Sequence, residues 1–117
     1  MKTNIIFKTR KIDDRTIELE ILPKVEVVVF KVSEDVNKAL EKYGNKSKLV
    51  KQAIKEFLDG KLKIRKVKTG RPTKSVGVKL YSEIRYKLDR TAEKLGINRS
   101  ELLRRIVIAK LKELGEL

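Results

Sequence analysis

The chain has 117 residues and a formal charge of +14, because 30 residues are Lys or Arg and 16 are Asp or Glu. It contains no Cys and no His, which excludes disulfides, thiolate chemistry and Cys or His metal sites, and removes the usual general base of an enzyme. No apolar run approaches the roughly 18 residues of a membrane span, and no signal-peptide pattern opens the chain. We therefore expect an intracellular protein of one ordinary domain, without cofactor, membrane partner or small-molecule substrate.

The excess of positive charge is more informative than the amount of charge. Charged residues make up 39% of the chain, and a charge-rich surface by itself is typical of a heat-adapted protein. Surface ion-pair networks need both signs, so heat adaptation leaves the imbalance unexplained. The basic balance favours a polyanionic partner.

The first segment, residues 1–24, is predicted to form a β extension. Residues 4–9 and 16–22 are β-branched and partly alternating, and they flank a polar stretch with Asp13 and Asp14 at its tip. This pattern is typical of a β-hairpin, which Pro23 would close before the next strand.

Residues 25–60 have the pattern of a strand followed by two helices. Alternation predicts a strand over residues 25–32 with one apolar face, formed by Val28, Phe30 and Val32. Ser33 is a typical N-cap, and a short amphipathic helix follows it as far as Gly44. The apolar stripe of this helix consists of Val36, Leu40 and Tyr43.

Asn45 is expected to begin a second helix, which ends at Gly60. Residues 61–74 then form a basic linker in which seven residues are Lys or Arg and none is acidic. Fully extended, the linker would reach about 45 Å.

Residues 75–117 repeat the strand–helix–helix pattern. A strand over residues 76–80 leads to a longer first helix that ends at Gly96, and Asn98 with Glu101 has the spacing of a capping box. The expected stripe of the longer helix is Ile84, Leu88, Ala92 and Leu95. Each unit alone is too small to bury a sufficient core, so we expect the two units to complete one another.

The repeat is clearest at the start of the second helix. Residues 45–51 (Asn-Lys-Ser-Lys-Leu-Val-Lys) recur as residues 98–104 (Asn-Arg-Ser-Glu-Leu-Leu-Arg), and each copy follows a glycine and a strand with a lysine on one face. This order resembles the ribbon-helix-helix superfamily of DNA-binding regulators (Arc/MetJ/CopG type). A tandem copy in a basic, heat-adapted chain is similar to tandem transcription regulators of archaeal viruses, for which the compartment would be the host cytoplasm.

The resemblance implies an α+β fold of two strand–helix–helix units. Their strands would pair antiparallel as a pseudo-dimer, within one chain or swapped between chains, and the ribbon would lie in the DNA major groove. The family's base-reading positions correspond here to Val27, Val29, Lys31, Ser75, Gly77 and Lys79. The two Val and the Gly depart from the usual polar residues, so we expect modest sequence preference and a large electrostatic share.

The resemblance also implies phosphate contacts at the two second-helix N-termini, where free backbone N–H groups attract anions. The residues concerned are Asn45, Lys46, Ser47, Asn98, Arg99 and Ser100. Plain helix capping would explain the two asparagines equally well. In the linker, Lys68, Arg71 and Lys74 could form a DNA arm in the minor groove, or part of a solvated tether.

The expected function is therefore a sequence-preferring, double-stranded DNA-binding transcriptional regulator, such as a repressor, that could also assemble along DNA. An antitoxin-like protein-interaction module is the alternative, with residues 1–23 as the partner-binding segment. RNA binding is less favoured because aromatic residues make up 5% of the chain, which leaves no stacking platform. Enzyme activity is not expected, since the adjacent carboxylates suit turns and caps.

Overall fold

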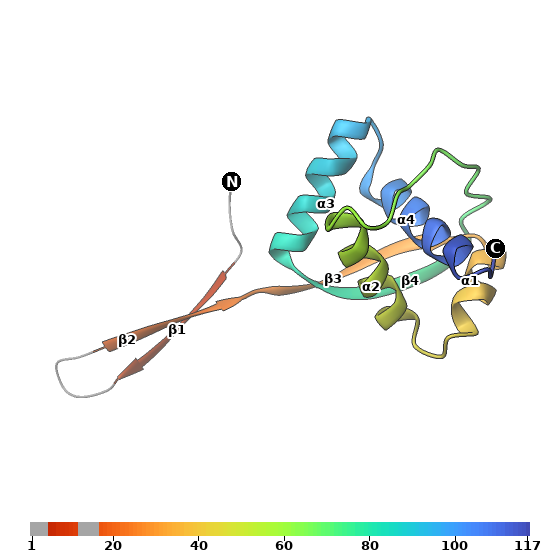
Figure 1. Cartoon of the computed structure of the whole chain (residues 1–117). Coiled ribbons are helices and arrows are strands. Elements are labelled where there is room, and N and C mark those ends of the chain that lie inside the picture. Colours follow the sequence, from red (N-terminus) through yellow and green to blue (C-terminus); the bar gives the residue numbers. More distant parts are fainter. Residues whose placement is uncertain (1–4, 12–16) are drawn as a thin grey trace.

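The computed structural model describes residues 5–11 and 17–117, and it describes the two hairpin strands by their backbone. Within these residues the fold is mixed α+β, which confirms the expected class (Figure 1). The elements in chain order are β1 (Ile5–Lys11), β2 (Ile17–Pro23), β3 (Val25–Val32), α1 (Glu34–Glu41), α2 (Lys46–Leu58), β4 (Lys74–Tyr81), α3 (Ser82–Leu95) and α4 (Arg99–Glu113).

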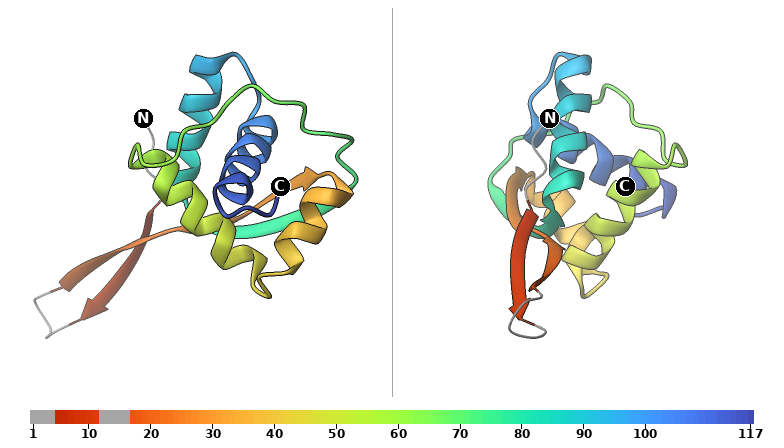
Figure 2. Two further views of the ribbon diagram at one scale, coloured as in Figure 1. Left: turned by 45° about the vertical axis from the view of Figure 1, so that its right-hand side comes forward. Right: turned by 90° about the vertical axis from the view of Figure 1, so that its left-hand side faces the viewer.

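The central feature is a two-stranded antiparallel ribbon of β3 and β4 from the same chain. Strict alternation gives this ribbon one buried and one exposed face. On the buried face, Val28 lies opposite Val78 and Phe30 lies opposite Val76. The right-hand view of Figure 2 shows the ribbon at one edge of the body, with the helices on its inner side.

The two halves of the chain pack crosswise on the inner face of the ribbon. Helix α2 of the first half packs on β4, helix α4 of the second half packs on β3, and α2 and α4 pack on each other. Neither half therefore has a core of its own. The most deeply buried residues come from both halves and include Phe30, Leu40, Val50, Ile54, Leu88, Leu102, Leu103, Ile106 and Leu111.

One buried ion pair also joins the two halves. Lys110 of α4 is 6% exposed at its side chain, and its Nζ donates to Oε1 of Glu56 on α2 at 2.8 Å. This hydrogen bond is the main cause that lowers the pKa of the Glu56 carboxyl. The pair fixes one helix against the other because a buried ammonium needs its partner.

The predicted helix caps are confirmed at three positions. The side chains of Ser33, Asn45 and Asn98 accept from the backbone N–H groups of Val36, Lys48 and Glu101, at 3.3, 3.0 and 2.8 Å. In a capping box the Glu101 side chain would in turn accept from the backbone N–H of Asn98. Its carboxylate accepts instead from Arg104 and Arg105, at 3.0 and 3.3 Å. Glu101 therefore holds the arginines of its own helix.

Two predicted helix stripes extend too far. Helix α1 ends at Glu41 with Lys42 as its C-cap, before Gly44, and Tyr43 is 39% exposed. Leu95, the last residue of α3, is 50% exposed. Both residues lie where the helix leaves the core, so their place in the apolar periodicity brings no burial.

The predicted linker is held against the body along its length. Leu62 is buried at 6% exposure, and the Thr73 N–H donates to the Val32 carbonyl at 3.0 Å. Gly70 has a φ of +73°, and a Cβ added there would lie 3.0 Å from Cβ of Ser33. The linker is therefore not a free tether, and Gly70 is required by both its φ and its close approach to the N-cap of α1.

We expect Gly70→Ala to lower the free energy of unfolding by about 2 kcal/mol. About half of this comes from the left-handed φ, and the rest from displacement of the Ser33 cap. Gly44→Ala is the matched control, because Gly44 has a φ of +72° with nothing within 4 Å of an added Cβ. Urea unfolding would measure both variants, and equal losses would show that the contact with Ser33 contributes nothing.

Strands β1 and β2 form a separate antiparallel hairpin that continues from β3 and projects away from the helices (Figure 1). The predicted β extension is thus confirmed for the described residues, whereas Asp13 and Asp14 lie outside them. In the described ranges 5–11 and 17–117, none of the helices combines the length and apolar character that crossing a bilayer requires.

Candidate nucleic-acid interface

The exposed side of the β3–β4 ribbon, called the outer face below, brings together all six residues that the sequence placed on it. Val27 lies opposite Lys79, Val29 opposite Gly77, and Lys31 opposite Ser75. All six are exposed, Val27 at 64% and Val29 at 57%. Their placement on one accessible surface follows from alternation, and their contact with DNA bases stays a prediction.

The outer face is close to two-fold symmetric about the Val29–Gly77 pair. Lys31 and Lys79 occupy corresponding positions of the two copies and lie two residues from this pair, on opposite strands and in opposite directions. The register therefore sets the two lysines diagonally across the ribbon. Side chains arranged in this way suit a partner that has local two-fold symmetry of its own, such as duplex DNA.

The outer face also includes one residue pair beyond these six residues. Val25 and Tyr81 form the next pair along the ribbon and are 51% and 53% exposed. Tyr81 ends β4 on the exposed side and is also the N-cap of α3, so its ring adds to the outer face rather than to the core. The alternation of residues 25–32, extended to its first member, was the available signal.

Each second helix also contributes a cation near the ribbon. Nη1 of Arg104 on α4 donates to the Lys31 carbonyl at 3.2 Å. Lys51 of α2 and Lys79 of β4 both line a groove on the surface of the molecule. Arg104 and Lys51 are the last residues of the two repeat motifs, 98–104 and 45–51. Their matched positions were visible in the repeat, but the residue pattern alone indicated no role for them.

The two second-helix N-termini have the same construction. Nζ of Lys46 donates to Oδ1 of Asn37 at 2.7 Å and to Oε1 of Glu41 at 3.3 Å. Nη1 of Arg99 donates to Oδ1 of Asp89 at 3.2 Å. Each cation is thus held by the preceding helix of its own half and its charge is partly neutralised, which the sequence did not indicate.

The remaining residues at these two ends leave backbone donors accessible. Ser47 and Ser100 are half-buried, and Asn45 and Asn98 are exposed. Each asparagine side chain satisfies one N–H group of the first turn, so other N–H groups of that turn stay available for an anion. Capping and anion binding are therefore compatible.

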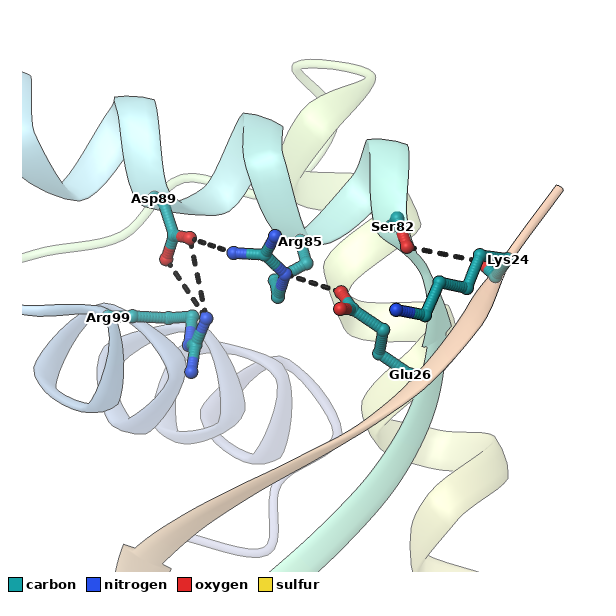
Figure 3. Close-up of polar contacts among 6 residues, drawn as sticks. All are labelled: Lys24, Glu26, Ser82, Arg85, Asp89 and Arg99. Carbon is teal, nitrogen blue, oxygen red and sulfur yellow. Dashed lines mark hydrogen bonds and ion pairs between the residues drawn. The ribbon is translucent and has the colours of Figure 1, made fainter. Parts of the chain in front are cut away.

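A chain of ion pairs connects the second of these N-termini to the ribbon (Figure 3). Glu26 of β3 accepts from Nε of Arg85 on α3, and Asp89 accepts from Nη1 of Arg85 at 2.7 Å and from Arg99. The hydrogen bond from Arg85 lowers the pKa of the Glu26 carboxyl, and Glu26 in turn raises the pKa of Arg85. Glu26 and Arg85 therefore stay charged near neutral pH, and the chain of contacts through Asp89 fixes Arg99 relative to β3.

The three residues of the predicted arm lie near one end of the ribbon. Lys68, Arg71 and Lys74 are all exposed. Lys74 is the first residue of β4, opposite Val32, and Arg71 directly follows the anchored Gly70. These cations are therefore presented from a fixed segment rather than from a free arm.

Neither the protein-family models, nor the curated protein sequences, nor the solved structures contain a match to this chain.

Proposed function

We propose that the protein is a double-stranded DNA-binding transcriptional regulator in which two ribbon-helix-helix units form a pseudo-dimer within one chain. The proposal rests mainly on one observation: Lys31 and Lys79 lie at symmetric positions on the exposed outer face of the β3–β4 ribbon. The crosswise packing of α2 on β4 and of α4 on β3 supports the pseudo-dimer, because neither half buries its apolar residues alone.

A two-stranded ribbon matches the major groove of B-DNA, which is about 12 Å wide and displays base edges. Lys31 and Lys79 can donate to guanine O6 and N7 or to phosphates, and the methyl groups of Val27 and Val29 can contact thymine methyls. No side-chain hydrogen bond is available from the valines or Gly77. Sequence preference is therefore modest, and the charge of +14 supplies a large share of the affinity.

The two second-helix N-termini contact phosphates on either side of the groove in this proposal. Binding would exchange the contact of Arg99 with Asp89, and that of Lys46 with Asn37 and Glu41, for a phosphate oxygen. Phosphate contacts fix register and carry no sequence information. The matched construction of the two ends supports one role for both.

We expect Lys46→Ala or Arg99→Ala to weaken binding to all duplex sequences alike and to reduce the slope of log K against log salt by about one. Lys38→Ala is a suitable control, since Lys38 is an exposed lysine of α1 outside these ends. Fluorescence anisotropy between 50 and 300 mM salt (on the order of the physiological range) would measure the slope. A slope that neither change alters would remove the helix ends from the interface.

The proposed function as a whole is tested by selection from random duplex DNA, followed by footprinting at two salt concentrations. We expect protection of a short, partly palindromic site and affinity that falls steeply with salt. Competition with duplex and single-stranded RNA belongs in the same experiment. Preference for RNA, or no protection at low salt, would contradict the proposal.

A protein-interaction module of the antitoxin type is the second candidate. The β1–β2 hairpin supports it, because it forms its own sheet and projects from the body (Figure 1). The comparison of the full chain with a variant lacking residues 1–23, against a defined partner and against DNA, separates the two functions. Loss of partner binding with DNA binding retained would assign the hairpin to a partner.

A further inference from the structure

A groove of about 950 Å³ lies between α2, α3 and the end of the ribbon where β3 begins and β4 ends. Its floor is apolar and comes from all of these elements. Ile54 and Leu80 are buried beneath it, whereas Leu58 and Ile84 are half-buried. Two aromatic side chains also line it, Tyr81 and Tyr86. None of this was visible in the sequence, because the residues come together only in the folded chain.

The rim of the groove is strongly cationic. Six exposed cations line it, and Asp59 is the one acidic residue among the described residues that do so. Within the described part of the chain, Lys87 and Arg90 have long, exposed contacts with Glu83 and Glu93, at 3.9 and 3.7 Å. The other four rim cations form no ion pair with any described residue, and they are Lys51, Lys55, Lys79 and Lys94.

The pseudo-symmetry of the fold shows that this apolar surface is incompletely covered. In the other half, the corresponding space is closed by α1 packed on α4, where Val36 is 4% and Leu111 is 0% exposed. The residues at the matching positions of the groove are Ile84 and Leu58, and both are half-buried. The same pattern of apolar residues therefore has a partner in one half and lacks one in the other.

We propose that this groove binds a single amphiphilic anion, with an apolar body on Leu58 and Ile84 and a carboxylate, sulfate or phosphate head at the rim cations. The volume lies within the range of small-molecule sites, roughly 300–1,000 Å³. An apolar floor with a cationic rim complements both parts of such a ligand. Bringing a negative head among crowded positive charges also relieves their mutual repulsion.

Three other occupants fit less well. A DNA duplex is too wide to enter the groove, and the apolar floor offers nothing to phosphates. A second copy of the chain carries the same charge of +14 and is repelled. A different protein is the third occupant. The rim of α3 from Lys87 to Lys94 spans about 10 Å, and a patch of that length falls well short of the roughly 800 Å² that each partner buries in a standard protein interface.

The position of the groove connects it to the ribbon. Lys79 and Tyr81 belong both to the groove lining and to the ribbon's outer face. A bound anion beside Lys79 lowers the positive potential at that end of the ribbon, so the ligand is expected to weaken DNA binding. This consequence rests on the proposed function, whereas binding of the ligand itself does not.

The test is calorimetric titration of the full chain, without DNA, using monomeric decyl phosphate as the probe. Inorganic phosphate, decanol and decyltrimethylammonium separate the contributions of head, tail and charge. We expect decyl phosphate to bind at least about tenfold more tightly than any of the three. Chemical-shift changes of the Ile84 and Leu58 methyl groups would place the ligand in the groove.

Two variants test whether ligand binding depends on the cations of the groove. Lys55→Glu with Lys87→Glu should weaken decyl phosphate binding by about tenfold or more. Lys66→Glu, an exposed linker lysine away from the groove, should change it by less than about twofold, because salt screens distant charges. Binding no tighter than inorganic phosphate, equal effects of the two sets of changes, or binding only to phosphatidylglycerol vesicles would each overturn the proposal. Because no DNA is present, such a failure leaves the proposed DNA-binding function untouched.

Discussion

The double substitution Lys31→Ala with Lys79→Ala is expected to lower the affinity for duplex DNA by about 2–6 kcal/mol, since each base or phosphate contact contributes about 1–3 kcal/mol. The two residues lie diagonally on the outer face, on either side of the Val29–Gly77 pair. They contact different half-sites in the proposed complex, so their effects should be nearly additive. Anisotropy titration with a selected duplex would measure the loss.

Two controls separate contact from net charge. Lys38→Ala with Lys66→Ala removes the same charge from exposed positions outside the outer face, and it should cost far less affinity at physiological salt. Lys31→Arg with Lys79→Arg keeps the charge, so it should retain the electrostatic share of the binding. If both alanine pairs weaken binding equally, the ribbon is not the DNA-contacting surface.

Phe30→Ala is expected to lower the free energy of unfolding by about 3–5 kcal/mol, the usual cost of truncating a fully buried phenylalanine. Phe30 is 2% exposed, and it lies opposite Val76 on the inner face that both halves cover. The loss is a large share of the roughly 5–15 kcal/mol that stabilises a domain of this size. Urea unfolding followed by circular dichroism would measure it.

The adjacent residue provides a matched control for this prediction. Val29 is next to Phe30 on β3 but is 57% exposed on the outer face, so Val29→Ala should change stability by about 0.5 kcal/mol or less. We also expect a single cooperative transition, because α2 and α4 pack across the two halves. Two separate transitions, or similar effects of the two substitutions, would contradict a shared core.

Local features of the fold could be predicted because they depend on near neighbours in the chain. Alternation was sufficient to separate Val28, Phe30 and Val32 from Val27 and Val29, since side chains point to opposite faces of a strand. The caps at Ser33, Asn45 and Asn98 follow from a side-chain oxygen one turn before the N–H that it accepts from.

Predictions failed where burial depends on distant segments. Tyr43 and Leu95 fit an apolar periodicity but lie beyond the point where their helices meet the core, and both are exposed. Tyr81 stands directly before α3, yet it belongs to β4, which presents its side chain on the outer face. Periodicity indicates which side of a helix or strand is apolar and cannot indicate how far the covering partner extends.

The strand faces, the helix caps, the repeat and the positive charge follow from the residues alone, because composition, side-chain alternation and capping act over short stretches of chain. The tertiary fold was needed to set Lys31 and Lys79 diagonally about Val29 and Gly77, since register depends on contacts between segments far apart in the chain. It also decided the ion pairs from Glu26 to Arg99 and the groove between α2 and α3. These features combine residues from several elements, and their geometry exists only after the two halves have packed on one another.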